Sequence, residues 1–171
     1  FVLYDAQSGE FLIGKNPDTR LSPASITKVM TVLLALENLS MTDTITVRKE
    51  MFSTIPNDYV RLGLFDGEEI TVEQALYATL LISANDAATA LALTMSESIE
   101  SFSAMMNERA ARLGCTGTNF TNPYGFADPE NLTTAHDMAL ILAAALEHEA
   151  YTKMSTTLQY LMPSTNKYGT R

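Results

Sequence analysis

The stretch "LSPASITKVMTVLLAL", residues 21–36, predicts the central element of the fold. Ser22 is a favourable N-cap residue and Pro23 suits the first helical position, so we expect a helix to begin here and run to about Asn38. Apolar residues recur at helical spacing and cover most of its circumference. They are Ile26, Val29, Met30, Val32, Leu33, Leu34, Ala35 and Leu36. A helix that is apolar nearly all round is buried at the centre of its domain.

Two polar side chains lie at the start of this apolar helix. Ser25 and Lys28 are three residues apart, and this spacing places them on one face of a helix with their Cβ atoms about 5–6 Å apart. The lysine amine is then within reach of the serine hydroxyl proton, and the unpaired backbone N–H groups of the first turn suit an oxyanion. The alternative interpretation is an ordinary first-turn serine beside a surface lysine whose aliphatic stem covers apolar surface.

Charge and composition exclude several classes of function. The chain has 171 residues, 46% of them hydrophobic, and a net charge of −9 at pH 7, which fits one globular domain or a large part of one. The acidic balance argues against a nucleic-acid partner, whose phosphates demand positive charge. No apolar run is long enough to span a membrane. No basic segment with a cleavage site is present, and because the sequence starts inside a strand pattern, we expect any export signal to lie upstream of Phe1.

Metal and thiol chemistry also have little support in the sequence. His136 and His148 are the only histidines and Cys115 is the only cysteine, so the sequence predicts no metal site, no cofactor and no internal disulfide. In "RLGCTGTNF" we expect Cys115 to fill a small apolar space rather than to act as a nucleophile.

Hydrophobic periodicity predicts one α+β domain over residues 1–171, with an N-terminal hairpin over residues 1–20 and a mainly helical body over residues 21–171. Short strands are expected over residues 1–4, 11–13 and 44–47. Further helices are expected over residues 71–82, 85–95, 101–114 and 135–149. Their expected capping residues are Thr71 with Gln74, Gly114, and Thr134 with Asp137.

The stretch "SAND", residues 83–86, is the second candidate for chemistry, because it forms a tight turn between two apolar helices. Ser83 and Asn85 flank a single small residue, so both side chains are able to project into one cleft beside the turn. Asp86 is better explained as the N-cap of the following helix, and the same capping role is the alternative for Asn85.

The combination of the two features is more specific than either alone. S-x-x-K at Ser25 and Lys28, followed about 58 residues later by S-x-N at Ser83 and Asn85, is the motif pair of the penicillin-recognising serine enzymes. With "PASITKVMT", "LLISANDAATALA", "FSAMMNERAARLGCTGTNFTNPYGF" and "TTAHDMA", the sequence resembles the D-alanyl-D-alanine carboxypeptidases, the low-molecular-mass penicillin-binding proteins of peptidase family S11. The resemblance covers essentially the whole chain and implies a β-lactamase/transpeptidase-like fold, here the N-terminal hairpin plus the helical subdomain.

The same resemblance implies a role for each residue of the two motifs. Ser25 would be the acylated nucleophile and Lys28 its general base. Ser83 would relay a proton to the leaving amine, and Asn85 would hold the substrate's backbone amide and Lys28. The implied substrate is a peptidoglycan stem peptide ending in D-Ala-D-Ala, and β-lactam antibiotics would trap Ser25 as a slow ester. The implied location is the outer face of the bacterial cytoplasmic membrane or the cell wall.

One departure from the family matters for the chemistry. The family's third motif, K-T-G or K-S-G on a strand, binds the substrate carboxylate and supplies an oxyanion donor. The nearest match here, Lys167-Tyr168-Gly169, has a tyrosine where a small hydroxyl is needed. We therefore expect this motif, and the sheet strands that would pair with the hairpin, to lie beyond Arg171. We also expect the 171-residue chain alone to be inactive and to self-associate through the hairpin edge.

Three other functions remain open at this point. A class A β-lactamase shares S-x-x-K, but it normally has S-D-N where this chain has Ala84, and the sequence around Glu130 lacks the expected deacylation pattern. A non-catalytic cell-wall-binding relic would explain the absent third motif. A Ser-His-Asp hydrolase would have to use His136 and Asp137, which point to different faces of a helix, and no G-x-S-x-G turn is present.

Overall fold

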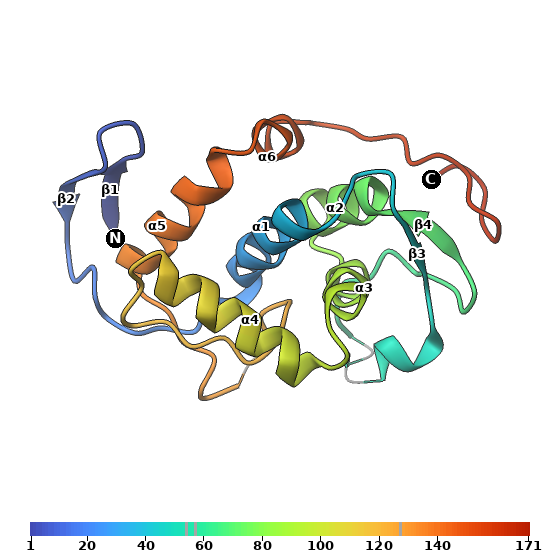
Figure 1. Ribbon diagram of the computed structural model, residues 1–171, viewed down its shortest axis with the longest axis horizontal. Helices are drawn as coiled ribbons and strands as arrows, with labels where there is room; N and C mark the ends of the chain where they lie inside the picture. Colours follow the sequence, from blue (N-terminus) through green and yellow to red (C-terminus); the bar gives the residue numbers. More distant parts are fainter. Residues whose placement is uncertain (54, 57, 127) are drawn as a thin grey trace.

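One helix, α1 (Lys28–Asn38), runs through the middle of the molecule, and the other long helices pack around it (Figure 1). Met30, Val32 and Leu33 on this helix are completely buried, as expected for a helix that is apolar on all sides. The prediction of a central helix that ends at Asn38 is therefore confirmed.

The computed structural model describes residues 1–53, 55–56, 58–126 and 128–171. The strands are β1 (Val2–Asp5), β2 (Glu10–Gly14), β3 (Thr44–Thr46) and β4 (Glu69–Thr71). The helices besides α1 are α2 (Val72–Leu81), α3 (Asn85–Met95), α4 (Ile99–Arg112), α5 (Ala135–Leu146) and α6 (Glu149–Ser155), and two short 3₁₀ helices are η1 (Ala24–Thr27) and η2 (Lys49–Phe52). The two chain termini lie at opposite ends of the long axis in Figure 1.

The entry into α1 differs from the prediction. The first turn is the 3₁₀ helix η1, and its N-cap is Pro23 with no side-chain cap, so the prediction of Ser22 as N-cap is wrong. Ile26 was expected to face the core, yet 56% of it is exposed. A 3₁₀ turn has three residues per turn, which rotates this side chain off the buried face of the following α-helix.

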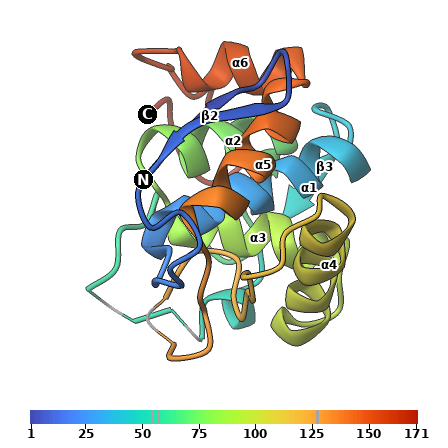
Figure 2. The same ribbon diagram turned by 90° about the vertical axis from the view of Figure 1, so that its left-hand side faces the viewer.

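Two small antiparallel sheets flank the helices. The predicted hairpin is confirmed, because β1 pairs with β2 from Val2–Gly14 to Asp5–Glu10 with an irregularity after Leu3. It lies at one end of the molecule beside α5 (Figure 2). Three of the four β1 residues are half-buried, whereas every β2 residue is exposed, with Leu12 and Ile13 at 54% and 60%. The self-association expected from this edge stays a prediction.

Local capping explains where most helices begin. Thr71 and Gln74 form the predicted capping box of α2, and Thr134 accepts the Asp137 N–H at the start of α5. The helix α4 starts earlier than predicted because Ser98 caps it. The helix expected over residues 135–149 stops at Leu146, and α6 follows as a separate helix that the periodicity did not indicate.

The main core lies between α1, α2, α3, α4 and α5. Its largest completely enclosed side chains include Phe102, Phe120, Leu76 and Ile141. This packing fixes the ends of α1 and α3, where the candidate site lies. Across the described ranges, every helix is too short or too polar to cross a membrane.

Candidate active site

The structure brings Ser25 and Lys28 together, as their spacing predicts. Lys28 Nζ donates a hydrogen bond to Ser25 Oγ at 3.3 Å and another to the backbone oxygen of Tyr124 at 2.8 Å. Ser25 is exposed, whereas Lys28 is only 3% exposed. The alternative of a surface lysine beside an ordinary serine is therefore wrong for Lys28.

Burial changes the acid–base character of this lysine. Loss of hydration lowers the pKa of Lys28 from its usual 10.5 to about 8, because an ammonium group is less stable away from water than a neutral amine. A lysine in this state is neutral often enough near neutral pH to accept a proton from a neighbouring hydroxyl.

Ser25 opens into a pocket of about 300 Å³ at the junction of η1, the turn before α3 and two loops. The lining residues are Ala24, Ser25, Asp58, Tyr59, Val60, Ser83, Asn85, Tyr124 and Gly125. The structure thus gathers Ser25, Ser83 and Asn85 around one hollow. Ala24 and Ser83 both have left-handed backbone conformations, with φ of 46° and 59°, and backbone strain of this kind is concentrated at functional sites.

Asn85 is anchored differently from what the family resemblance implies. Its backbone N–H and its side-chain Nδ2 both donate to the backbone oxygen of Val60, at 3.0 and 2.9 Å. In the described part of the chain, no hydrogen bond joins Asn85 to Lys28. Its Oδ1 has no partner among the described residues and is left to accept an N–H from a ligand.

Asp86 does not cap α3, so that prediction is wrong. The N-cap is Ala84, without a side-chain cap. The buried Asp86 carboxylate instead accepts the backbone N–H groups of Leu62, Gly63 and Leu64 at 2.9, 2.9 and 3.1 Å. These bonds hold residues 62–64, which follow the pocket wall at Val60, against α3.

The pocket wall at Tyr124 and Gly125 was also missed by sequence reasoning. Gly125 has φ of +86°, and a Cβ atom added there would lie 1.7 Å from the backbone oxygen of Ala24. Only glycine allows this approach of the loop to the residue before Ser25. The sequence "NPYG" contains the turn-forming residues that indicate a tight loop here.

Several residues considered from sequence lie away from this pocket. His136 Nδ1 is 3.0 Å from Asp18 Oδ1, and Asp137 accepts from Gly117 N and Thr118 Oγ1 at 2.8 and 2.6 Å. Neither lines the pocket, so a Ser-His-Asp site is wrong. Glu130 is not among the lining residues either.

The segment that contains Lys167-Tyr168-Gly169 lies on the β3–β4 side of the molecule. There Asn166 Oδ1 accepts the Glu69 N–H at 2.8 Å, and Arg171 Nη2 contacts Glu68 Oε1 at 2.6 Å. None of these residues lines the Ser25 pocket. That the segment does not act as the family's third motif stays a prediction.

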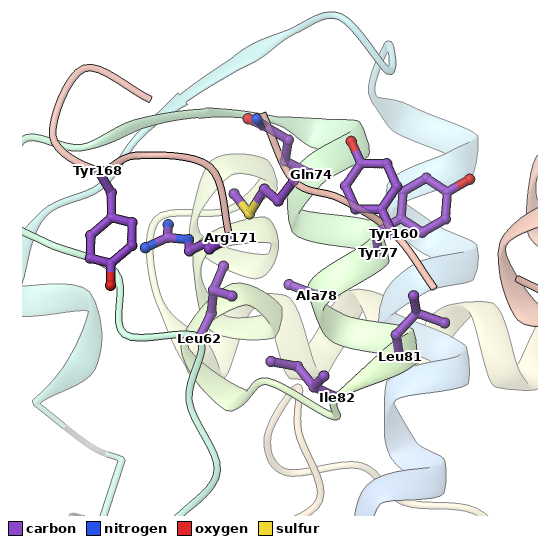
Figure 3. Close-up of a pocket in the computed structure, with 10 residues that line it drawn as sticks. Leu62, Gln74, Tyr77, Ala78, Leu81, Ile82, Tyr160, Tyr168 and Arg171 are labelled. Carbon is purple, nitrogen blue, oxygen red and sulfur yellow. The ribbon is translucent and has the colours of Figure 1, made fainter. Parts of the chain in front are cut away.

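A second hollow of about 330 Å³ lies between α2 and the C-terminal segment (Figure 3). Its lining is largely apolar and aromatic, and the Tyr77 and Tyr160 rings stack there with centroids 3.8 Å apart. One residue that lines this second hollow, Ile82, directly precedes the motif residue Ser83 in the sequence. Within the described residues, no three His, Cys, Asp or Glu side chains are grouped as metal ligands.

Solved structures share this fold. The D-alanyl-D-alanine carboxypeptidase from Mycobacterium tuberculosis H37Rv matches 99% of this chain and 63% of its own, with a TM-score of 0.89 and 31% identity. A mutant of the Streptomyces K15 DD-transpeptidase matches 99% of this chain and 69% of its own, with a TM-score of 0.90 and 28% identity. The fold is therefore of the β-lactamase/transpeptidase-like class found in penicillin-binding DD-peptidases.

The sequence narrows this class to one family. A sequence model of D-alanyl-D-alanine carboxypeptidases matches residues 1–169. DacF, a D-alanyl-D-alanine carboxypeptidase of Bacillus subtilis strain 168, is 36% identical over 97% of this chain, which spans 43% of DacF. The chain belongs to the D-alanyl-D-alanine carboxypeptidase family, peptidase family S11.

Proposed function

We propose that this chain carries the acylating residues of a serine-type D-Ala-D-Ala carboxypeptidase that acts on peptidoglycan stem peptides. The observation that carries the proposal is the Ser25–Lys28 contact of 3.3 Å, made by a buried lysine. A serine hydroxyl is a weak nucleophile until a neighbouring base removes its proton. Membership of the carboxypeptidase family supports the same chemistry.

In the proposed acylation, Ser25 Oγ attacks the carbonyl carbon of the penultimate D-Ala, and its proton passes to Lys28 Nζ. The C–N bond to the terminal D-Ala then breaks, and the proton held by Lys28 passes through the Ser83 hydroxyl to the leaving amine, which returns Lys28 to its neutral form. An ester on Ser25 remains. Asn85 Oδ1 accepts an amide N–H of the bound peptide, which fixes the carbonyl in front of Ser25.

In the proposed deacylation, a water molecule attacks the ester carbon and gives its proton to Lys28. The Ser25 oxygen leaves with a proton from the same lysine, so the enzyme returns to its starting state. Splitting amide hydrolysis in this way replaces one difficult step by two easier ones. A β-lactam would follow the acylation step and remain on Ser25.

The proposed substrate also fixes the proposed location. Peptidoglycan stem peptides are found in the bacterial cell wall, so we place the protein at the outer face of the cytoplasmic membrane or in the wall itself. The partners are then the stem peptide ending in D-Ala-D-Ala and β-lactam antibiotics.

The test is release of D-Ala from a peptide ending in D-Ala-D-Ala by the full gene product that contains this chain. We expect release by the unchanged protein and loss of release in Ser25→Ala. Ser22→Ala is the matched control, because Ser22 is exposed and caps no helix, and it should release D-Ala normally. Rapid turnover of penicillin with no release of D-Ala would favour a β-lactamase instead.

A further inference from the structure

A single side chain closes the turn that covers Lys28. Asn122 Oδ1 accepts the backbone N–H groups of Tyr124, Gly125 and Phe126 at 3.3, 2.7 and 2.8 Å. Asn122 Nδ2 reaches Thr121 Oγ1 and the Phe126 backbone oxygen, both at 3.3 Å. The side chain is only 7% exposed. The Asn122 amide thus holds three consecutive backbone N–H groups of this turn, and Asn131 Nδ2 adds a longer contact of 3.4 Å to the Phe126 oxygen.

The turn contacts Lys28 directly and also contacts the residue before Ser25. The Tyr124 backbone oxygen accepts a hydrogen bond from Lys28 Nζ at 2.8 Å. Gly125 lies against the backbone of Ala24, the residue before Ser25. Thr31 Oγ1 donates to the Pro123 backbone oxygen at 2.6 Å and ties the turn to α1.

These contacts control the direction in which the lysine amine points. A neutral amine has two N–H donors and one lone pair. When one N–H is held by the Tyr124 oxygen at 2.8 Å, rotation about the Cε–Nζ bond is restricted. The two other positions of the neutral amine, an N–H and the lone pair, are then the ones that can face Ser25 Oγ, 3.3 Å away. With the turn in place, Lys28 is only 3% exposed.

We propose that Asn122 is a positioning residue for the Ser25–Lys28 pair. It touches neither residue and acts through the turn, by holding the Tyr124 carbonyl over Lys28 and Gly125 against Ala24. The inference rests on the proposed function, since it takes Lys28 to be the base. It adds a residue that lies outside both sequence motifs.

The chain offers a matched control in Asn107. Its Oδ1 accepts the Phe120 N–H at 2.7 Å and its Nδ2 donates to the Phe120 oxygen at 2.9 Å. Asn107 thus braces the same loop with a half-buried side-chain amide, but among the described residues its hydrogen bonds go to Asn119 and Phe120 and not to the 122–126 turn or Lys28. Any general loosening of the loop should appear in both variants, whereas a positioning effect should appear only at Asn122.

The experiment is an NMR titration of the Lys28 Cε–H signal in the full gene product that contains this chain. The only formally charged side chain that lines the described pocket is Asp58, which is exposed, and the low pKa of Lys28 comes from burial. We expect a midpoint near 8 for the unchanged chain and for Asn107→Ala. In Asn122→Ala, water reaches Nζ and relieves the burial penalty, so the midpoint should rise by about one unit or more.

Two results would overturn the proposal. One is a folded Asn122→Ala chain in which Lys28 titrates as in the unchanged protein, and the other is an equal rise in Asn107→Ala. If Asn122→Ala does not fold, Gly125→Ala displaces the same turn with Asn122 intact, and there a rise supports the proposal and an unchanged midpoint overturns it. The titration needs no acylation, so failure of Ser25 to react with penicillin would reject the proposed function alone.

Discussion

A buried lysine at the start of an apolar helix lowers the stability of the fold, because its charge loses hydration. Lys28 keeps only 3% of its surface exposed. Burial lowers its pKa to about 8, so roughly a tenth of the molecules carry a neutral lysine at pH 7. The neutral form is the one able to accept the Ser25 proton. At the scale of the residue, the cost of burial is thus linked to the proposed chemistry.

The rate of Ser25 acylation should follow the titration of this lysine. The rate should rise with pH and level off above a midpoint near pH 8, and well below that midpoint it should fall about tenfold for each pH unit as Lys28 becomes protonated. Acylation rates of the full gene product with a fluorescent penicillin, measured across this range, test the expectation. A midpoint at the ordinary lysine value of 10.5 would exclude the buried amine as the base.

Cys115 is predicted to be inert. Its Sγ lies 3.6 Å from the Asp137 backbone oxygen, and burial together with the negative charge of Asp137 raises the pKa of the thiol to about 12. At pH 8 almost none of it is thiolate, which is the reactive form. An aromatic disulfide reagent should therefore modify native Cys115 at least about 100-fold more slowly than Cys115 in the denatured chain. Similar rates in the two states would contradict this assignment.

At the scale of the element, α3 is joined to the pocket wall by Asp86. Asp86→Ala would leave three backbone N–H groups of residues 62–64 without their acceptor, and we expect a loss of about 3 kcal/mol in the free energy of unfolding. Asp66→Ala is the control, because exposed Asp66 accepts one N–H, from Lys49 at 2.9 Å, and it should cost less than about 1 kcal/mol. Equal losses in chemical denaturation would show that Asp86 has no special role.

The helices that could be predicted from sequence are those with strong local signals. The apolar run of α1 and the capping pair of α2 identify both elements, because the relevant residues are close in the chain. The short α6 has no such pattern and was missed. Asp86 was misread as a cap because its partners lie up to 24 residues away, and a local pattern contains no information about contacts over that distance.

The residues of the candidate site also fall into two groups, those that the sequence indicates and those that only the structure shows. Ser25, Lys28, Ser83 and Asn85 were found because their spacing within each motif is short. Tyr124 and the wall at Val60 come from irregular segments, where hydrophobic periodicity gives no signal. Asn122 belongs to "NPYG" and can be recognised from sequence as a turn-forming residue. Its connection to Lys28 through Tyr124 is visible only in the structure.

At the scale of the whole molecule, the pocket lacks a partner for a substrate carboxylate. None of the described residues that line it is an arginine or lysine, and the chain spans 43% of DacF. We expect the 171-residue chain alone to release D-Ala at least about 100-fold more slowly than DacF, because positioning and oxyanion contacts of this kind each contribute factors of that size. The comparison needs one peptide and equal enzyme concentrations, and equal rates would show that this pocket is sufficient.

The most direct measurement of the central claim is the position at which a penicillin attaches to the full gene product. Mass spectrometry of the intact protein should show one penicilloyl group, and peptide mapping should place it on Ser25. The adduct should persist for minutes or longer, since no glutamate lines the described pocket to activate water. Ser25→Ala should give no adduct, and Ser22→Ala should be labelled like the unchanged protein. An adduct on another residue, or one that survives in folded Ser25→Ala, would contradict the account.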